Sequence, residues 1–86
     1  MAPIYRIEIS RKAQRELEKI PRKEQQRIKA AIDALAFDPR PHGNLKMSGE
    51  EHTYRIRIGV YRVIYDIFDD VLIVEVIRVG HRQGVY

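Results

Sequence analysis

The sequence predicts an α+β domain in which two helices cover one face of an antiparallel sheet. One short stretch near the N-terminus and three in the C-terminal half alternate apolar with polar residues, the period of a strand. Residues 11–37 between them carry apolar side chains at helical spacing instead. A chain of 86 residues holds one domain. We therefore expect a single domain over residues 1–86 with the order β-α-α-β-β-β.

The first strand and the first helix follow one another directly. Ile4 to Ile9 alternates in the manner of a strand, and Ser10 then offers a helix N-cap. Helical spacing runs from Arg11 to Ile20, and Pro21 ends this helix and can open the next.

The second helix is predicted from Arg22 to Phe37, where apolar residues recur at i, i+3, i+4 and i+7. It forms an antiparallel hairpin with the first helix. Asp38 to Asn44 contains two prolines, a glycine and an asparagine, which predicts a loop.

The three remaining strands form an antiparallel meander, predicted at His52–Ile58, Val60–Phe68 and Val71–Val79. Pairing about Gly59-Val60 sets Arg57 opposite Arg62 and Arg55 opposite Ile64. A two-residue turn at Asp69-Asp70 directs six side chains toward the helices: Val63, Tyr65, Ile67, Leu72, Val74 and Val76. This register leaves Asp66 and Glu75 on the arginine side of the sheet.

Composition narrows the function classes. The formal charge of +4 and a pI near 9.6 favour a polyanionic partner, which is nucleic acid, an acidic protein segment or, last in order, anionic lipid. Cysteine is absent, which excludes disulfides and thiolate metal sites, and the three histidines lack metal-ligand spacing, so we assign no metal and no cofactor. The sequence offers neither a signal peptide nor a membrane span, and we expect a cytoplasmic protein without a membrane partner.

The arginines of the last third are the first candidate site. Arg55, Arg57 and Arg62 share one predicted face, and guanidinium groups bind phosphate oxygens through two parallel hydrogen bonds. Fixed cations also stabilise the charge that develops on a phosphorane. The competing interpretation is an ordinary solvated strand face whose arginines pair with Asp66 or Glu75.

The residues after the last strand form the second candidate site. A histidine side chain suits proton transfer, which makes His81 a candidate, although an exposed bystander is the competing interpretation. Tyr86 can stack on a nucleobase or, as a terminal residue, simply fray.

The order and spacing of these motifs resemble the RelE branch of the RelE/ParE toxin superfamily. The motifs that carry the resemblance are Lys46-Met47-Ser48-Gly49, Tyr54 through Tyr65, Val79-Gly80-His81-Arg82 and Val85-Tyr86. Because the β-α-α-β-β-β layout matches as well, the resemblance covers nearly the whole chain. The resemblance implies a toxin of a type II toxin–antitoxin system, an endoribonuclease that cleaves mRNA in the ribosomal A site without a metal. The nucleophile would be the ribose 2′-hydroxyl, and the partner would be an antitoxin of the RelB type.

The resemblance also implies roles for single residues. Arg55 and Arg57 take the two basic positions of the Tyr-x-Ile-x strand, Arg62 that of the transition-state arginine and Arg82 that of the general acid. Tyr86 falls near the family's base-stacking tyrosine, at a shorter spacing from Arg82 than in well-known members. The extra C-terminal helix of some relatives is not expected.

One departure bears on the mechanism. Relatives commonly carry lysines where Arg55 and Arg57 stand, and arginine is a poor general base because it stays protonated. Either electrostatic stabilisation and substrate alignment carry the reaction, or His81 takes the proton.

Two other functions stay open. A ParE-like inhibitor of DNA gyrase would use the same fold without nuclease chemistry. A toxin-like RNA-binding protein without activity is the remaining interpretation.

Overall fold

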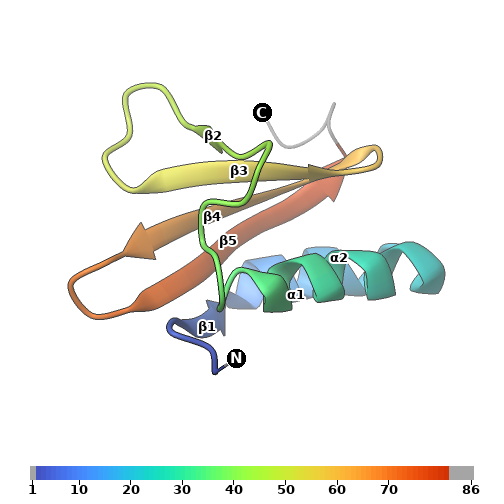
Figure 1. The fold of residues 1–86 in the computed structure, drawn as a ribbon. Coiled ribbons are helices and arrows are strands. Elements are labelled where there is room, and N and C mark those ends of the chain that lie inside the picture. The colour runs from blue at the N-terminus through green and yellow to red at the C-terminus, as the bar shows by residue number, and fades with distance from the viewer. Residues whose placement is uncertain (1, 82–86) are drawn as a thin grey trace.

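The computed structural model describes residues 2–81, which form one mixed sheet with two helices on one side (Figure 1). The elements are β1 (Arg6–Ile9), α1 (Arg11–Glu18), α2 (Arg22–Ala34), β2 (Leu45–Lys46), β3 (Thr53–Ile58), β4 (Tyr61–Phe68) and β5 (Ile73–His81). The five strands lie in the order β1-β5-β4-β3-β2. The α+β class and the order of the predicted elements are confirmed.

The sheet differs from the predicted antiparallel one in two respects. β1 pairs with β5 in parallel, with Arg6 opposite Ile73 and Ile9 opposite Val76. β2, a strand of two residues, pairs with β3 and was not predicted. Alternation of apolar and polar residues shows that a segment is a strand, but it does not show which strand the segment pairs with. A strand of two residues is too short to show any period.

The helices begin where their caps predict. The Ser10 hydroxyl accepts a hydrogen bond from the Ala13 amide at 3.0 Å, and Pro21 precedes α2. Both helices end a little earlier than the apolar spacing suggested. The chain beyond α2 continues to Phe37 as a tight turn, because the amides of Leu35, Ala36 and Phe37 bond to carbonyls three residues back.

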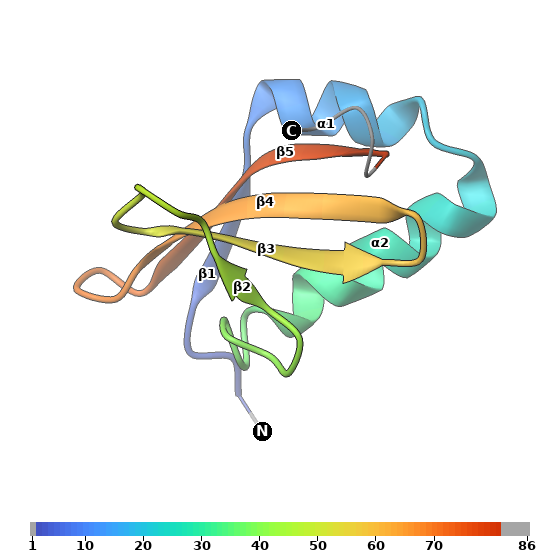
Figure 2. The same cartoon turned by 90° about the horizontal axis from the view of Figure 1, so that it is seen from above.

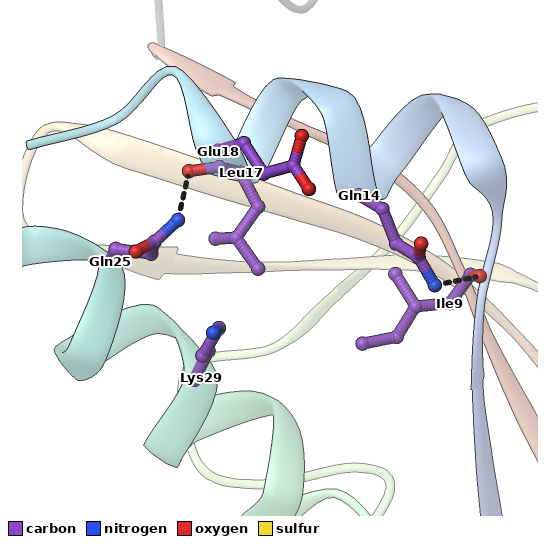
Figure 3. Close-up of a pocket in the computed structure, with 6 residues that line it drawn as sticks. All are labelled: Ile9, Gln14, Leu17, Glu18, Gln25 and Lys29. Atoms are coloured by element: carbon purple, nitrogen blue, oxygen red, sulfur yellow. Dashed lines mark hydrogen bonds between the residues drawn. The ribbon is translucent and has the colours of Figure 1, made fainter. Parts of the chain in front are cut away.

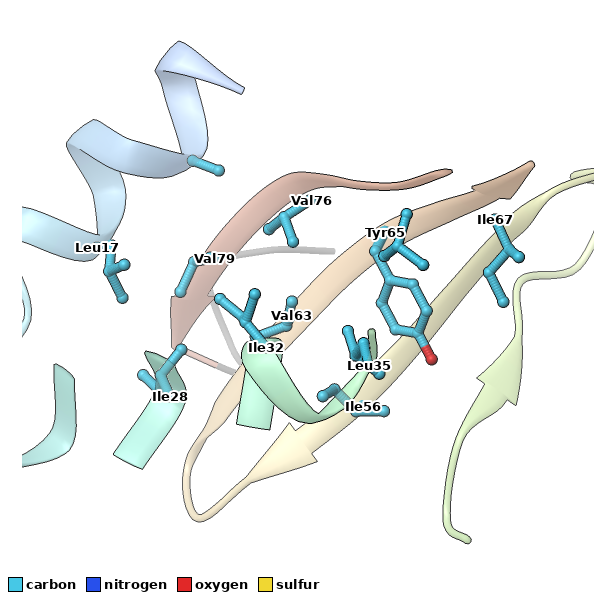
Figure 4. Close-up of a cluster of buried hydrophobic side chains, with 12 residues drawn as sticks. Leu17, Ile28, Ile32, Leu35, Ile56, Val63, Tyr65, Ile67, Val76 and Val79 are labelled. Carbon is cyan, nitrogen blue, oxygen red and sulfur yellow. The ribbon is translucent and has the colours of Figure 1, made fainter. Parts of the chain in front are cut away.

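The core lies between the helices and the inner face of the sheet (Figure 4). It is built from Ala13, Leu17, Ile28, Ile32, Leu35, Ile56, Val63, Tyr65, Ile67, Val74, Val76 and Val79. In Figure 2, α2 lies behind β3 and β4 while α1 runs along β5. Five of the six side chains expected to face the helices are therefore confirmed.

Leu72 is the exception, because the turn between β4 and β5 is longer than predicted. Phe68 pairs with Ile73, so four residues connect the strands instead of two. Leu72 has a φ of +56° and is 44% exposed. A left-handed backbone conformation is costly for leucine, and leucine is not a residue type that predicts a turn position.

Glu16 joins α1 to the edge of β5 beyond the point where β1 ends. One carboxylate oxygen accepts the Val79 amide at 2.9 Å, and the other accepts Arg78 Nε at 3.0 Å. The Glu16 side chain thus takes the place of a neighbouring strand at Val79. It also fixes the segment of β5 that leads to Gly80 and His81.

Within residues 2–81, no helix is long and apolar enough to cross a membrane.

Candidate nucleic-acid interface

The β3–β4 hairpin places the predicted arginines together. Ile58 pairs with Tyr61 across the two-residue loop Gly59-Val60, and Gly59 has a φ of +60°. A glycine at the first loop position is what a type II′ hairpin turn requires. Arg57 consequently stands directly opposite Arg62, as predicted.

The three arginines share the face of the sheet that points away from the helices. Arg55 pairs with Ile64, and Arg57 and Arg62 lie two residues further toward the turn on both strands. Their neighbours Ile56 and Val63 point into the core, so alternation directs the arginines to the opposite side. Arg57 is exposed, while Arg55 and Arg62 are partly buried. We call Arg55, Arg57 and Arg62 the arginine face.

The other end of the same surface is acidic. Asp66 pairs with Glu75, and Glu75 also pairs with Glu8 of β1, which sets three carboxylates in a row across β4, β5 and β1. Thr53 donates a hydrogen bond to Asp66 at 2.5 Å. Asp66 and Glu75 thus lie on the arginine side, as predicted. The surface is polarised, with cations near the Gly59 turn and anions near the opposite end of the strands.

His81 does not join the arginine face. It pairs with Tyr61, and the two rings meet edge to face with centroids 6.0 Å apart. Tyr61 packs against the core, and the residue that pairs with Arg62 is Gly80. Alternation therefore places His81 on the helix side of the sheet. The other two predicted site residues, Arg82 and Tyr86, lie outside the described residues.

A cluster at the acidic end of the sheet escaped the sequence analysis. Arg40 Nη2 lies 2.8 Å from Asp69 Oδ2, and the Arg40 guanidinium stacks 5.1 Å from the centre of the Tyr54 ring. Tyr5 also donates to Asp69. The hydrogen bond from Arg40 and then that from Tyr5 hold the pKa of Asp69 below its ordinary value. An arginine between two prolines was the available signal, and its partner is 29 residues away.

This cluster ties the 38–44 loop to the turn between β4 and β5. Beneath it, the Tyr65 hydroxyl donates to the Pro39 carbonyl at 2.8 Å, and burial raises the pKa of Tyr65. Because its polar groups are satisfied by one another, the cluster has the character of a structural clamp.

Two hollows adjoin the helices. A groove of about 420 Å³ follows the edge of β3 from Ile56 to Ile58, between α2 and the 41–43 loop, with Arg57 at its rim. The second hollow lies between α1 and α2 (Figure 3). There Gln25 donates to the Leu17 carbonyl at 2.8 Å and Gln14 donates to the Ile9 carbonyl at 3.4 Å. The amide groups of this second hollow serve to join the elements.

The described residues offer no metal centre, since no three His, Cys, Asp or Glu side chains gather within residues 2–81.

Comparisons with known proteins identify the same fold and family. The family model of the ParE toxin of the type II toxin–antitoxin system parDE matches residues 7–86. The toxin RelG of Mycobacterium tuberculosis is 32% identical over 87 residues, which cover 95% of each chain. RelE1 of Methanocaldococcus jannaschii is 27% identical over 85 residues, with 95% of this chain and 94% of the relative covered.

Comparison with solved structures points to the same family. RelE from the RelE–RelB complex of Pyrococcus horikoshii superimposes with a TM-score of 0.80 at 25% identity, covering 95% of this chain and 99% of that one. The RelBE2 toxin–antitoxin complex of M. tuberculosis gives 0.67 at 31% identity, with 94% of this chain and 100% of that one covered. The relatives named in both comparisons are RelE-type proteins. The chain is therefore a member of the RelE/ParE family of type II toxin–antitoxin toxins, on its RelE branch.

Proposed function

We propose that this protein is a ribosome-dependent endoribonuclease that cleaves mRNA in the A site and thereby inhibits translation. The observation that carries the proposal is the placement of Arg57 opposite Arg62, with Arg55 on the same face. Like charges directly opposite one another in a sheet are destabilising, so such a pair is expected where a polyanion binds between them.

The arginines act on one phosphodiester. Arg55 and Arg57 hold the phosphate, and the ribose 2′-oxygen attacks phosphorus while the bond to the 5′-oxygen breaks. Negative charge grows on the equatorial oxygens in this step, and Arg62 stabilises it. Arg82 is proposed to hydrogen-bond the leaving 5′-oxygen and to stabilise its developing charge, and the proton that this oxygen takes up comes from water. The products are a 2′,3′-cyclic phosphate and a 5′-hydroxyl.

The acidic row limits where the message can lie. Glu75 and Asp66 repel phosphates, while the charge of Glu8 is partly offset by its ion pair with Arg6, so the RNA backbone is favoured at the end of the sheet near Gly59. We propose that Tyr86 stacks on a base beside the cleaved bond. The message is thus held by phosphate at the arginines and by base stacking beyond β5.

The arginine face holds no base that can accept the proton of the 2′-hydroxyl group. Arginine does not accept a proton, and His81 lies with Tyr61 on the helix side. We propose that alignment and electrostatic stabilisation carry the reaction, and that the proton leaves to water or to a group of the ribosome.

The regulatory partner is an antitoxin of the RelB type. The support is that solved relatives are complexes of RelE with RelB, as in P. horikoshii. Such a partner would neutralise the arginine face by covering it with carboxylates.

In vitro translation followed by primer extension tests the proposal. Wild-type protein is expected to create new 5′ ends within A-site codons of a translated message, and none on the same message without ribosomes. Cleavage of free message at equal rate would remove the ribosome from the mechanism. An intact message together with inhibited DNA supercoiling by gyrase would favour the ParE-like function.

A further inference from the structure

The last part of β5 is paired with a strand on one edge. β4 pairs with β5 from Ile73 to His81, whereas β1 pairs with β5 as far as Val76. Within residues 2–81, no strand covers the second edge of residues 77–81. In Figure 2, α1 runs along this edge. The side chains of α1 and its cap therefore decide how this part of β5 is held.

This part of β5 begins with a β-bulge. Tyr65 pairs with Val76, but Ile64 pairs with Arg78. Ile77 is thus an extra residue on β5 without a counterpart on β4. A bulge interrupts the ladder, bends the strand that carries it and often lies beside an active site. We call residues 77–81 the bulged end of β5.

The start of α1 holds the bulge itself. The Ser10 hydroxyl donates to the carbonyl of Ile77 at 3.0 Å, and the Ser10 amide donates to the carbonyl of Val76 at 2.9 Å. Ser10 is also the N-cap of α1, so the position of the bulge is tied to the position of the helix.

Glu16, further along α1, holds the chain beyond the bulge. Its carboxylate accepts the Val79 amide at 2.9 Å and Arg78 Nε at 3.0 Å. The side chains of Glu16 and Arg78 are 22% and 26% exposed, so water has limited access to these bonds. Without the carboxylate, the Val79 amide would lose its partner on this edge, and the bulged end of β5 would be free to shift.

The bulged end of β5 is the neighbour of Arg62. Val79 pairs with Val63, and Gly80 pairs with Arg62. Arg62 is partly buried, and its Nε atom is completely buried. The direction of its guanidinium therefore depends on how the surrounding backbone is packed, and the backbone at Gly80 is part of those surroundings.

We propose that Glu16 is a positioning residue of the nuclease site and acts through the bulged end of β5 on Arg62. The inference rests on the proposed function, in which Arg62 stabilises the transition state. Glu16 belongs to α1 and is connected to Arg62 through the pairing of β5 with β4. Small displacements are sufficient for a large effect, because a misplacement of about 1 Å can slow a reaction about 100-fold.

Single-turnover cleavage of ribosome-bound message by Glu16→Ala tests the proposal. Binding to the same ribosomes is measured in parallel, under conditions in which urea denaturation shows every variant to be folded. Cleavage is expected to fall by roughly 10- to 100-fold, while binding changes by less than about twofold. Such a split would show that Glu16 affects the reaction and not the capture of the message.

Two further variants serve as controls. Glu16→Gln keeps an oxygen that can accept the Val79 amide, so its cleavage is expected to stay within about threefold of wild type. Glu18→Ala removes an exposed carboxylate from the same helix and is expected to leave cleavage and binding unchanged.

A double-mutant cycle with Arg62 separates positioning from a general loss of structure. If Glu16 acts through Arg62, Glu16→Ala should cost little further cleavage in the Arg62→Ala protein. Amide hydrogen exchange adds a measurement that needs no message. In Glu16→Ala, the Val79 amide should exchange faster than in wild type, and the exchange of the Val63 amide should stay unchanged.

Three outcomes would overturn the proposal: undiminished cleavage by Glu16→Ala, the same loss from Glu16→Ala with and without Arg62, or an equal loss from Glu16→Gln. Failure of the proposed function is recognised separately, because wild-type protein would then leave the message intact during translation. That result would also remove the role of Glu16 in cleavage.

Discussion

Arg57 and Arg62 stand directly opposite each other across β3 and β4, one pair before the turn at Gly59. Opposed like charges in a sheet cost stability, by roughly 0.2–1 kcal/mol. A fold that carries such a pair at a well-formed hairpin sacrifices stability at the place where we propose that phosphate binds.

Relief of this repulsion is expected to stabilise the protein. Arg57→Thr introduces a residue that favours strands and should raise the free energy of unfolding by roughly 0.5 kcal/mol. Urea denaturation measures the change. Arg6→Thr, which breaks an ion pair with Glu8 on β1, is the control and should bring no gain. Destabilisation by Arg57→Thr would mean that Arg57 stabilises the hairpin and that the pair is a structural feature.

Tyr65→Phe is expected to destabilise the protein by about 1–3 kcal/mol. The buried Tyr65 hydroxyl donates to the Pro39 carbonyl, and its removal leaves this acceptor without its donor. Tyr61→Phe is the matched control, since Tyr61 lies on the same strand and is only partly buried. Equal denaturation midpoints for the two variants would contradict this account of the clamp.

Asp69 is expected to make stability depend on pH in the acid range. Its pKa is lowered in the folded protein, so the unfolded chain binds the proton more strongly. The resulting stability is present above the unfolded pKa of about 4 and is lost as the pH falls through the folded value. Thermal melts of wild type and Asp69→Asn measure it. The melting temperature of the wild type should fall more steeply below pH 4 than that of the variant, and parallel curves would refute the coupling.

His81→Ala is expected to leave the cleavage rate nearly unchanged. His81 contacts Tyr61 on the helix side of the sheet, away from Arg57 and Arg62. The pH–rate profile in the translation system is the measurement, with Tyr61→Phe as a control for the packing of the two rings. Loss of a rate inflection near the pKa of histidine would restore His81 as the general base.

The β3–β4 hairpin and the starts of the helices can be predicted from the sequence, because residues local to each element determine them. Gly59 fixes the hairpin turn, the turn fixes the register, and the register brings Arg57 to Arg62. Ser10 and Pro21 likewise fix where the helices begin. Alternation alone assigned Val74 and Val76 to the core.

The remaining features depend on contacts between distant segments. The parallel pairing of β1 with β5 joins strands separated by both helices, and the clamp between Arg40 and Asp69 joins two turns. The side of His81 follows from its pairing with Tyr61, which a β-bulge between Ile64 and Tyr65 shifts by one residue. A bulge reverses the face of every later residue, and no local signal marked it.

The most direct test of the central claim compares Arg62→Ala with wild type in single-turnover cleavage of ribosome-bound message, with binding to the same ribosomes measured in parallel. If Arg62 stabilises the transition state, cleavage should fall by about 10²–10³-fold while binding changes far less. Arg62→Lys, which keeps the charge but loses the planar donor pair, should fall between the two. Equal losses in cleavage and binding would make Arg62 a positioning contact, and undiminished cleavage would contradict the account.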